Sequence, residues 1–441
     1  MTDHAALGEA MHALATQLFP ITRSLTGPGY RQTLGVLERV SGPMARHSFV
    51  SGERVLDWDV PKEWTIREAW VKAPDGSKVV DLADSNLHVV GYSVPVHEHM
   101  SLARLQEHLH SLPGQPQAIP YRTSYYDEAW GFCLADDQRR ALAEGEYEVL
   151  IDADLEDGAV EVGEVVIDGT SRDEVLLWTY CCHPSMANNE LSGPVVAAHL
   201  AALLRERAGT LRHTYRVVFA PETIGAIAYL SRFGERLRER LVAGYVLTCV
   251  GDPGPFTYKR SRRGDALADR VAEHVLSVSG DEHRVLGFVP VGSDERQFCS
   301  PGFNLPVGSL MRTMYGVYPE YHTSRDDLSL ITAGALGESL RAYEQIVDAI
   351  EANETLVGTV LHGEPQLGRR GLYPKTGGPS DALAAGRQQD VMYLLSFCDG
   401  SADLLAAAEA SGRPLTELAA VADLLRSHDL LRPVAVGSPR P

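Results

Sequence analysis

The sequence predicts an α/β protein: a mostly parallel sheet flanked by helices, with a β-rich insertion and a winged-helix-like module near the C-terminal end. Three observations lead to this prediction. Strand-like and helical segments alternate from residue 160 to 350, a pattern typical of a parallel sheet covered by helices. Short strand-like runs separated by turns fill residues 48–159. After Arg387 the pattern is a helix, a turn, two helices and a short strand.

The chain begins with two expected helices. The first, up to residue 18, is indicated by apolar residues at helical spacing, namely Leu7, Met11, Leu14 and Leu18. The second lies near residues 31–40. We assign residues 1–47 and 160–355 to one α/β core, because the β-rich unit at 48–159 interrupts it.

The β-rich insertion is expected to contain strands at residues 54–60, 64–71, 78–82, 88–94, 131–134 and 147–152. In the core, apolar runs predict strands at 174–179, 216–220 and 244–250. Helices are expected at 194–204, 224–232, 265–279 and 333–352. Residues 353–385 read as irregular. The C-terminal module, 380–441, is expected to hold helices at 390–397, 402–410 and 415–426 and a strand at 430–433.

Composition narrows the class of protein. The 441 residues carry a net charge of −19, which argues against a general nucleic-acid binder, since such proteins present a basic face. The first residues lack the basic start and apolar run of a signal peptide, and no apolar run approaches the ~20 residues that a membrane span needs. The six cysteines show no framework spacing. A reduced, cytoplasmic enzyme is therefore expected.

Four polar clusters follow predicted strands, where α/β proteins place their sites. His183 and Glu190 follow the strand at 174–179, and Glu222 follows the strand at 216–220. Asp294 and His322 lie in later loops. We expect these side chains to converge although they are far apart in the sequence.

The residue types suggest metal-assisted hydrolysis. A catalytic zinc needs about three protein ligands and one open position for water, and a nearby carboxylate takes the proton. His183, Glu190, Asp294 and His322 are candidate ligands, and Glu222 is the candidate base. Plainer explanations stay open at this point. A lone histidine or glutamate on a loop is usually only solvated, and Glu222 could simply cap the following helix.

Several stretches together resemble a known family. They are FPITRSLTG (19–27), DWDVPKEW (57–64), SNLHVVGYS (85–93), PYRTSYY (120–126), WGFC (130–133), CHPSMANNELSG (182–193), PETIG (221–225), SDERQF (293–298) and PEYHTS (319–324). The chain resembles bacterial aminopeptidase-like proteins associated with polysaccharide or secondary-metabolite biosynthesis. Their core is similar to that of the zinc exopeptidases. The resemblance spans nearly the whole chain and implies a zinc-aminopeptidase-like core, an inserted β domain and a C-terminal winged helix.

The resemblance also implies roles for single residues. His183 matches the first metal-binding histidine of the exopeptidases, His322 the last, and Glu222 the general base. Three uncharged residues, Asn189, Thr223 and Thr248, replace carboxylates of the two-metal pattern. A site short of anionic ligands favours one zinc over two. His183 and His322 would hold it with one carboxylate, for which Glu190 is the first choice and Asp294 the second.

Candidate substrate-binding residues are less specific. Arg260 and Arg262 lie in a basic run, 259–263, that could clamp a carboxylate or phosphate, although such runs are often only solvated loops. Arg312 and Tyr321 are further candidates for the pocket. Residues in or near the matching stretches extend this set to Arg23, Arg122, Tyr125 and Tyr126.

The expected helix at 415–426 contains one arginine, no lysine, and the acidic residues Glu417 and Asp423. A helix that reads a DNA groove should present basic and amide side chains. The module is therefore expected to serve packing, partner docking or homo-oligomer formation.

Taken together, the sequence predicts a zinc-dependent aminopeptidase-like amidohydrolase acting on a small peptide or aminoacyl amide, such as a biosynthetic intermediate. Two other classes remain open. One is a metal-poor, non-hydrolytic protein that binds a peptide or sugar, and the other is a winged-helix DNA-binding regulator.

Overall fold

The structure is a computed structural model that describes residues 2–372 and 382–434, and only the backbone of 382–386. Residues 380, 381 and 435–441 of the expected C-terminal module lie outside this range. The chain divides into two compact units. One comprises Met1–Ala268 and Arg284–Arg341, and the other comprises Asp269–His283 and Ala342–Pro441.

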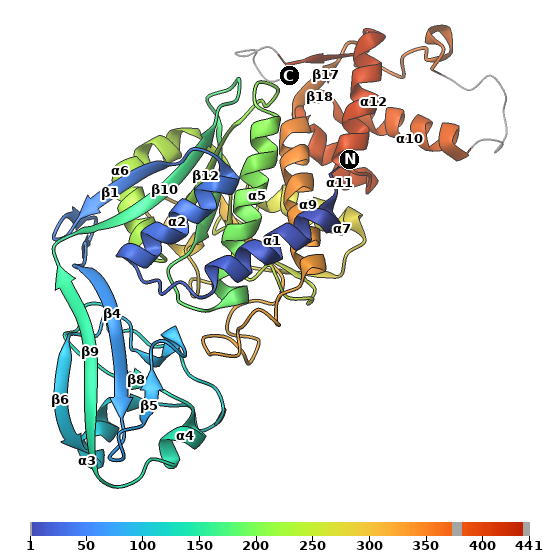
Figure 1. Ribbon diagram of the computed structural model, residues 1–441. Helices are drawn as coiled ribbons and strands as arrows, with labels where there is room; N and C mark the ends of the chain where they lie inside the picture. Colours follow the sequence, from blue (N-terminus) through green and yellow to red (C-terminus); the bar gives the residue numbers. More distant parts are fainter. Residues whose placement is uncertain (1, 373–381, 435–441) are drawn as a thin grey trace. The chain divides into compact units, whose positions relative to one another are not determined.

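The main sheet has eight strands in the order β1-β10-β12-β11-β13-β16-β14-β15 (Figure 1). Their bounds are β1 Ala45–Val50, β10 Ala159–Ile167, β11 Glu174–Tyr180, β12 Thr214–Ala220, β13 Leu241–Leu247, β14 Phe256–Lys259, β15 His283–Leu286 and β16 Val307–Met311. The pairs β11–β12, β11–β13 and β13–β16 are parallel. The outer pairs β1–β10, β10–β12 and β14–β16 are antiparallel. The expected parallel sheet thus forms the centre.

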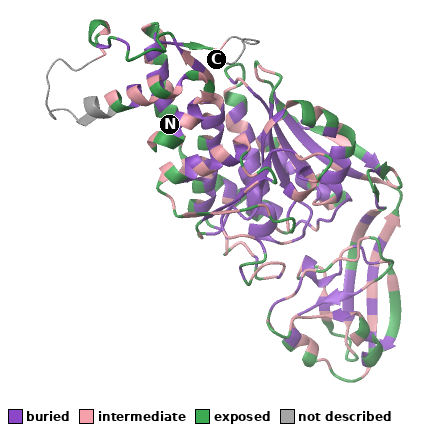
Figure 2. Cartoon of the chain, turned by 180° about the vertical axis from the view of Figure 1, so that it is seen from behind, coloured by how far each residue is buried: buried purple, intermediate pink, exposed green. Residues whose placement is uncertain are grey.

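Every residue of β11 and β12 is buried, as their continuous apolar runs predict for strands covered on both faces (Figure 2). Successive strand residues point to opposite faces. The Trp178 ring lies 5.4 Å from that of Tyr229, on helix α6 (Ile224–Arg240). The next residue, Thr179, packs beside Gly193 of α5 (Ser192–Glu206). Helices α5 and α6 therefore cover opposite faces of the sheet.

The remaining helices of this region have the following bounds: α1 His4–Leu18, α2 Pro28–Ser41, α7 Leu267–Ser279, α8 Glu295–Phe298 and α9 Ala333–Ala352. Helices α1 and α2 both pack on α5. None of the helices in the described part of the chain combines the length and apolarity needed to cross a bilayer.

The insertion contains a four-stranded antiparallel sheet in the order β5-β4-β9-β6. The strands are β4 Glu63–Lys72, β5 Lys78–Asp81, β6 Val96–Ser101 and β9 Glu146–Glu156. Smaller elements complete it: β2 Arg54–Val55, β3 Trp58–Asp59, α3 Leu102–Leu105, β7 Leu109–His110, β8 Phe132–Cys133 and α4 Asp136–Arg140.

Two expected strands of the insertion are wrong. Residues 54–60 form a tight hairpin in which β2 pairs with β3, because the chain reverses near Leu56, which has a φ of 54°. Residues 88–94 form only isolated bridges, and Tyr92 has a φ of 66°, which turns the chain. The residues in this stretch are apolar because they are buried in the core of the insertion, not because they belong to a sheet. The neighbouring strand is β6, which the sequence did not predict.

The second unit contains helices α10 Ala382–Phe397, α11 Leu404–Ser411 and α12 Leu415–Ser427. A three-stranded sheet in the order β18-β17-β19 accompanies them, with bounds β17 Thr355–Gly358, β18 Asp399–Asp403 and β19 Leu431–Pro433. Three helices with a small sheet form a winged helix. Strand β17 corrects the expectation that the whole of 353–385 is irregular.

Candidate active site

The candidate active site lies at the carboxyl edge of the two central strands. Tyr180, the last residue of β11, is in register with Ala220, the last residue of β12. His183 follows β11 and Glu222 follows β12, so the parallel pairing brings the two loops together. This is the edge at which open α/β sheets bind their ligands.

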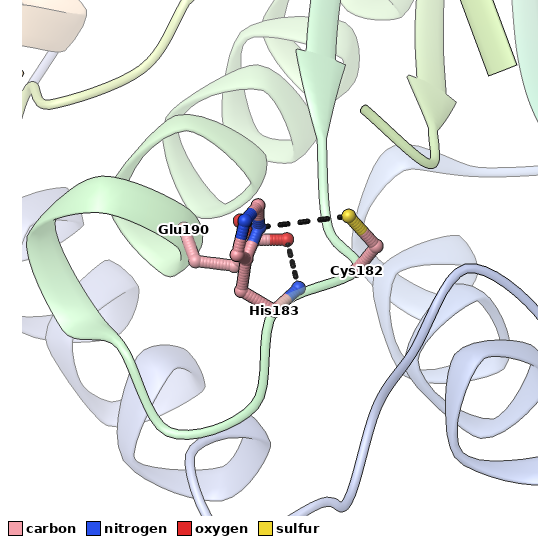
Figure 3. Close-up of side chains that lie close together, drawn as sticks. All are labelled: Cys182, His183 and Glu190. Atoms are coloured by element: carbon pink, nitrogen blue, oxygen red, sulfur yellow. Dashed lines mark hydrogen bonds and ion pairs between the residues drawn. The ribbon is translucent and has the colours of Figure 1, made fainter. Parts of the chain in front are cut away.

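Glu190 folds back against His183 because residues Ala187–Leu191 form a single π-helical turn before α5. The backbone N–H of His183 donates to Glu190 Oε1 at 2.8 Å, and the ring Nδ1 lies 2.6 Å from Oε2 (Figure 3). Both side chains are buried. Burial alone lowers the pKa of His183, but the charge and hydrogen bond of Glu190 outweigh it and raise that pKa above its ordinary value. Glu190 thus fixes the orientation of the imidazole ring.

Glu222 approaches the other ring nitrogen of His183. Its Oε2 lies 3.6 Å from Nε2. Burial raises the pKa of Glu222 to about 8, while the charge of His183 acts against this rise. The carboxyl group of Glu222 is therefore mostly protonated at pH 7 unless a nearby cation stabilises its charged form.

Asp294 supports the loop that carries Glu222. It is fully buried, and its Oδ1 accepts the backbone N–H of Thr223 at 2.8 Å. Its Oδ2 accepts the indole N–H of Trp178, also at 2.8 Å. Thr223 has a φ of 63°, a left-handed conformation that costs energy in a residue other than glycine. Asp294 thus stabilises this strained turn, and both its oxygens bind protein donors.

His322 enters from the loop after β16. Its Nε2 is buried and has no hydrogen-bond partner among the described residues. Burial lowers its pKa to about 3, so the ring is neutral at pH 7. The ring stacks on Tyr321 with centroids 3.9 Å apart, and its centroid lies 5.3 Å from that of His183. A neutral imidazole with a free nitrogen can bind a metal ion or accept a proton.

These side chains open into a cavity of about 420 Å³. His183, Glu222 and His322 line it together with residues of the insertion and of the core, namely Leu25, Trp58, Tyr121, Arg122, Thr123, Tyr125, Tyr126, Thr223, Ile224 and Arg296. The insertion meets the core here. The backbone N–H of Tyr121 donates to the carbonyl of His322, and Pro120 forms an isolated bridge with Thr323.

The structure separates the four expected substrate-binding residues. Arg262 lines a neighbouring cavity, and Tyr321 stacks on His322. Arg260 lines neither cavity; its backbone N–H donates to Leu286. Arg312 is buried and binds Glu338 through both Nη atoms, at 3.0 and 2.6 Å, so it holds helix α9 in place of a ligand.

Arg23 and Arg122, the two other candidate arginines, also lie in different surroundings: one is buried behind the site and one lines the cavity. Arg23 is buried and donates to the backbone carbonyls of His183 and Leu18, so it supports the His183 loop from behind. Arg122 lines the cavity, as do Tyr125 and Tyr126.

The sequence did not single out Tyr121 or Arg296. The ring of Tyr121 lies 4.8 Å from that of His183 and 5.3 Å from that of His322, and thus packs against both imidazoles. Arg296 Nη2 donates to Thr223 Oγ1 at 3.3 Å. Both residues lie in stretches that carry the family resemblance, which is the one signal that could have found them.

Among the described residues, one group of three potential metal ligands is tight, formed by Cys182, His183 and Glu190. Burial raises the pKa of the Cys182 thiol well above its ordinary value, and a protonated thiol is a poor ligand. Both oxygens of Glu190 already bind His183. Other histidine nitrogens of cavity-lining residues are Nε2 of His183, 3.6 Å from Glu222, and the buried Nε2 of His322.

Comparison with known proteins identifies two regions. A family model described as a domain of unknown function, DUF4910, matches residues 12–353. A winged helix-turn-helix model, HTH_47, matches residues 354–433, which confirms the predicted C-terminal winged helix.

Individual relatives agree with this division. A Clostridium acetobutylicum protein, provisionally named a polysaccharide biosynthesis protein with an aminopeptidase-like domain, is 44% identical over 425 residues, 96% of each chain. The crystal structure of a provisionally named peptidase from the same organism has a TM-score of 0.91 at 42% identity, covering 98% of each chain. A zinc aminopeptidase from Bacillus subtilis has a TM-score of 0.54 at 12% identity, covering 76% of this chain and 94% of its own. The aminopeptidase-like α/β fold is thus confirmed.

Proposed function

The chain belongs to the DUF4910 family, and on that basis we propose that it is a zinc-dependent hydrolase of the aminopeptidase type. The substrate class is a small peptide or an aminoacyl amide, such as a biosynthetic intermediate. We also propose a cytoplasmic location, where buried cysteine thiols such as those of this chain are the norm.

The observation that carries the proposal is the pair of imidazoles at the cavity. Within the described part of the chain, the buried Nε2 of His322 has no hydrogen-bond partner. Because Nδ1 of His183 contacts Glu190, its Nε2 remains on the side of Glu222, 3.6 Å from that carboxyl group. A carboxylate behind a histidine is the usual support of a metal-binding imidazole. By their chemistry, His183 and His322 suit one zinc ion, and a carboxylate would complete the set. Among the described residues, the group of three already at ligand spacing is Cys182, His183 and Glu190, so His322 and Glu222 would move closer to His183 when the ion binds.

When bound, zinc polarises the scissile carbonyl and makes a water molecule more acidic. Glu222 accepts one proton from the attacking water and passes it to the leaving nitrogen. A carbon–oxygen bond forms and the amide carbon–nitrogen bond breaks, which yields a carboxylic acid and an amine. Glu190 and Asp294, the carboxylates first expected as ligands, have positioning roles in this proposal: Glu190 orients His183, and Asp294 holds the turn after Glu222.

The same geometry supports one metal ion over two. Asn189 and Thr248 stand where the two-metal exopeptidases have carboxylates, and both contact the Tyr180 hydroxyl, at 3.4 and 2.7 Å. These groups are uncharged, and the amide nitrogen of Asn189 is buried without a hydrogen-bond partner among the described residues. A second dication there would lack anionic ligands.

The decisive experiment combines metal analysis with turnover. We expect about one zinc per chain after reconstitution and hydrolysis of aminoacyl amides. Glu222→Gln should keep the zinc and lower kcat by roughly 10²- to 10⁴-fold, because it removes the proton acceptor. Glu239→Gln, on an exposed face of α6, is the matched control and should behave like the wild type.

Two results would overturn the proposal. The first is a protein that takes up no zinc and turns over no aminoacyl amide, which would favour a non-hydrolytic binding protein. The second is full activity in Glu222→Gln. Loss of zinc along with activity in that variant would make Glu222 a ligand in place of the base.

The winged helix gives little support to a DNA-binding regulator. On α12, Glu417 and Asp423 are exposed. Arg426 pairs with Glu354 and with Asp423, and the preceding Arg413 pairs with Asp390 and Glu417. These cations are already neutralised, so we propose a packing or partner-docking role for this module.

A further inference from the structure

A second cavity, of about 480 Å³, adjoins the first. The two share Trp58, Thr223 and Arg296 in their walls. The second cavity continues past Thr223 to Arg262 and an apolar wall that includes Phe288 and Pro290. A ligand in the first cavity can therefore extend beyond Glu222 into the second.

Arg296 stands where the cavities meet. Its side chain donates to Thr223 Oγ1, next to Glu222 in the sequence, which is its one side-chain hydrogen bond among residues 2–372 and 382–434. Its Nε is buried and has no hydrogen-bond partner among the described residues. No carboxylate lies within ion-pair distance of its guanidinium group in that part of the chain. A buried guanidinium N–H left unpaired is costly, which is typical of a group that waits for a ligand.

Arg262 provides a second positive charge farther along the same groove. It is exposed, and its Nη1 donates to the amide oxygen of Asn304 at 3.3 Å. Like Arg296, it has no carboxylate partner among the described residues. The positive charge of Arg296 acts on Glu222 and Asp294 from beyond ion-pair distance. Two guanidinium groups along one groove without a carboxylate in direct contact, within the described part of the chain, stand out at a net charge of −19.

We infer that Arg296, assisted by Arg262, binds a carboxylate group of the substrate, so that the enzyme prefers substrates with a free carboxylate close to the scissile amide. This inference rests on the proposed function for the position of the amide. The planar guanidinium group offers two parallel N–H donors that match the two oxygens of a carboxylate. A dipeptide with a free C-terminus is the simplest member of this class, and an acidic side chain could supply the same group.

The inference is tested by binding, so that it does not depend on turnover. Calorimetry with Glu222→Gln protein would compare alanyl-alanine, alanyl-alanine amide and alanyl-glutamate α-amide. Alanyl-alanine has its carboxylate at the C-terminus, and alanyl-glutamate α-amide has it on the side chain. Alanyl-alanine amide has no carboxylate. We expect at least one of the two carboxylate compounds to bind about tenfold or more tightly than the neutral one, since a charge-assisted hydrogen bond contributes about that factor.

Variants then assign the effect. Arg296→Gln in the Glu222→Gln background should abolish the preference, and Arg262→Gln should reduce it. Arg262 is exposed, so its variant keeps the test valid if Arg296→Gln fails to fold. Arg238→Gln, which removes an exposed arginine from α6, is the matched control for net charge and should keep the full preference.

Equal affinity for all three compounds, or no binding of any of them, overturns the inference. So does a preference that survives both substitutions. A carboxylate preference that depends on Arg296 in a protein without hydrolytic activity would uphold the inference and reject the proposed function.

Discussion

At the scale of single residues, the contact between His183 and Glu190 shows what the sequence could and could not predict. Their positions after a predicted strand indicated a shared role at a site. The direction of Glu190 could not be predicted, because it depends on one π-helical turn that rotates the side chain back toward the ring. Glu190, which we expected as a metal ligand, therefore contacts Nδ1 of His183, whereas Glu222 lies near Nε2.

We expect Glu190→Gln to weaken zinc binding by about 10- to 100-fold, the usual effect of removing a carboxylate behind a metal-binding histidine. The variant side chain can accept only one of the two N–H groups of His183, and its amide N–H₂ opposes the other. Competition with a chromophoric chelator measures this change.

The control for this prediction is Glu206→Gln, an exposed substitution at the end of α5, the helix that follows the turn with Glu190. Zinc affinity equal to that of the wild type in Glu190→Gln would contradict the role of Glu190 in orienting His183.

At the scale of elements, the junction between β12 and α6 is held by a residue distant in sequence. Asp294 joins this junction to β11 by accepting from both Thr223 and Trp178. The sequence predicted Asp294 as the second candidate for the carboxylate ligand of the metal. It could not show that both oxygens bind protein donors, because those donors come from two other elements.

Asp294→Asn should leave the zinc content unchanged and lower the free energy of unfolding by about 1–3 kcal/mol, because the amide can accept from only one of the two donors. Burial raises the pKa of Asp294 to about 7, so ionisation of the wild-type carboxyl group opposes folding above that pH, and denaturant unfolding is best measured near pH 6, where both side chains are mostly neutral. Asp157→Asn, in an exposed turn, is the control. Loss of zinc from Asp294→Asn would show that the residue is a ligand.

Helices and strands were predictable where the hydrophobic pattern extends over many consecutive residues. The expected helix at 333–352 has the bounds of α9, and the central strands lie where apolar runs predict them. Strand β17 was missed because it has four residues and gains its pairing from strands more than 40 residues farther along the chain. Such a pairing leaves almost no local trace.

At the scale of the whole molecule, the large sheet is tied to its covering helix by a buried charge cluster. Arg216 of β12 binds Glu164 of β10 and Glu174 of β11, with distances of 2.9 and 2.6 Å. Glu164 also accepts from Tyr229 of α6 at 2.6 Å and lies 2.8 Å from His47 Nε2 of β1. Four strands and one helix therefore depend on these charges.

This cluster predicts acid sensitivity. Burial by itself raises the pKa of Glu164, but hydrogen bonds from His47 and Tyr229 and the charge of Arg216 lower it overall, from an ordinary 4.5 to about 2. A lowered carboxyl pKa stabilises the fold above the unfolded-state value, and the effect is lost as pH falls toward the folded-state value. The charge of Glu164 should therefore contribute roughly 3 kcal/mol at pH 6.

Unfolding of wild type and Glu164→Gln at several pH values tests this estimate. The stability difference between them should be full above pH 5 and shrink steadily at lower pH. Glu156→Gln, an exposed substitution at the end of β9, should show no such convergence. A difference that does not change with pH would mean that folding leaves the pKa of Glu164 unshifted, which would contradict the stabilising role of its charge.

The backbone contact of Tyr121 with His322 has a consequence for how the site is assembled in time. The His322 loop is left-handed at that residue, with a φ of 56°, and the insertion holds it by hydrogen bonds on both sides. The insertion is synthesised early, whereas His322 emerges about two hundred residues later. We therefore expect the insertion to provide the surface on which the loop with the last imidazole docks. During refolding, the ability to bind metal should appear only after both segments have docked, later than the central sheet itself.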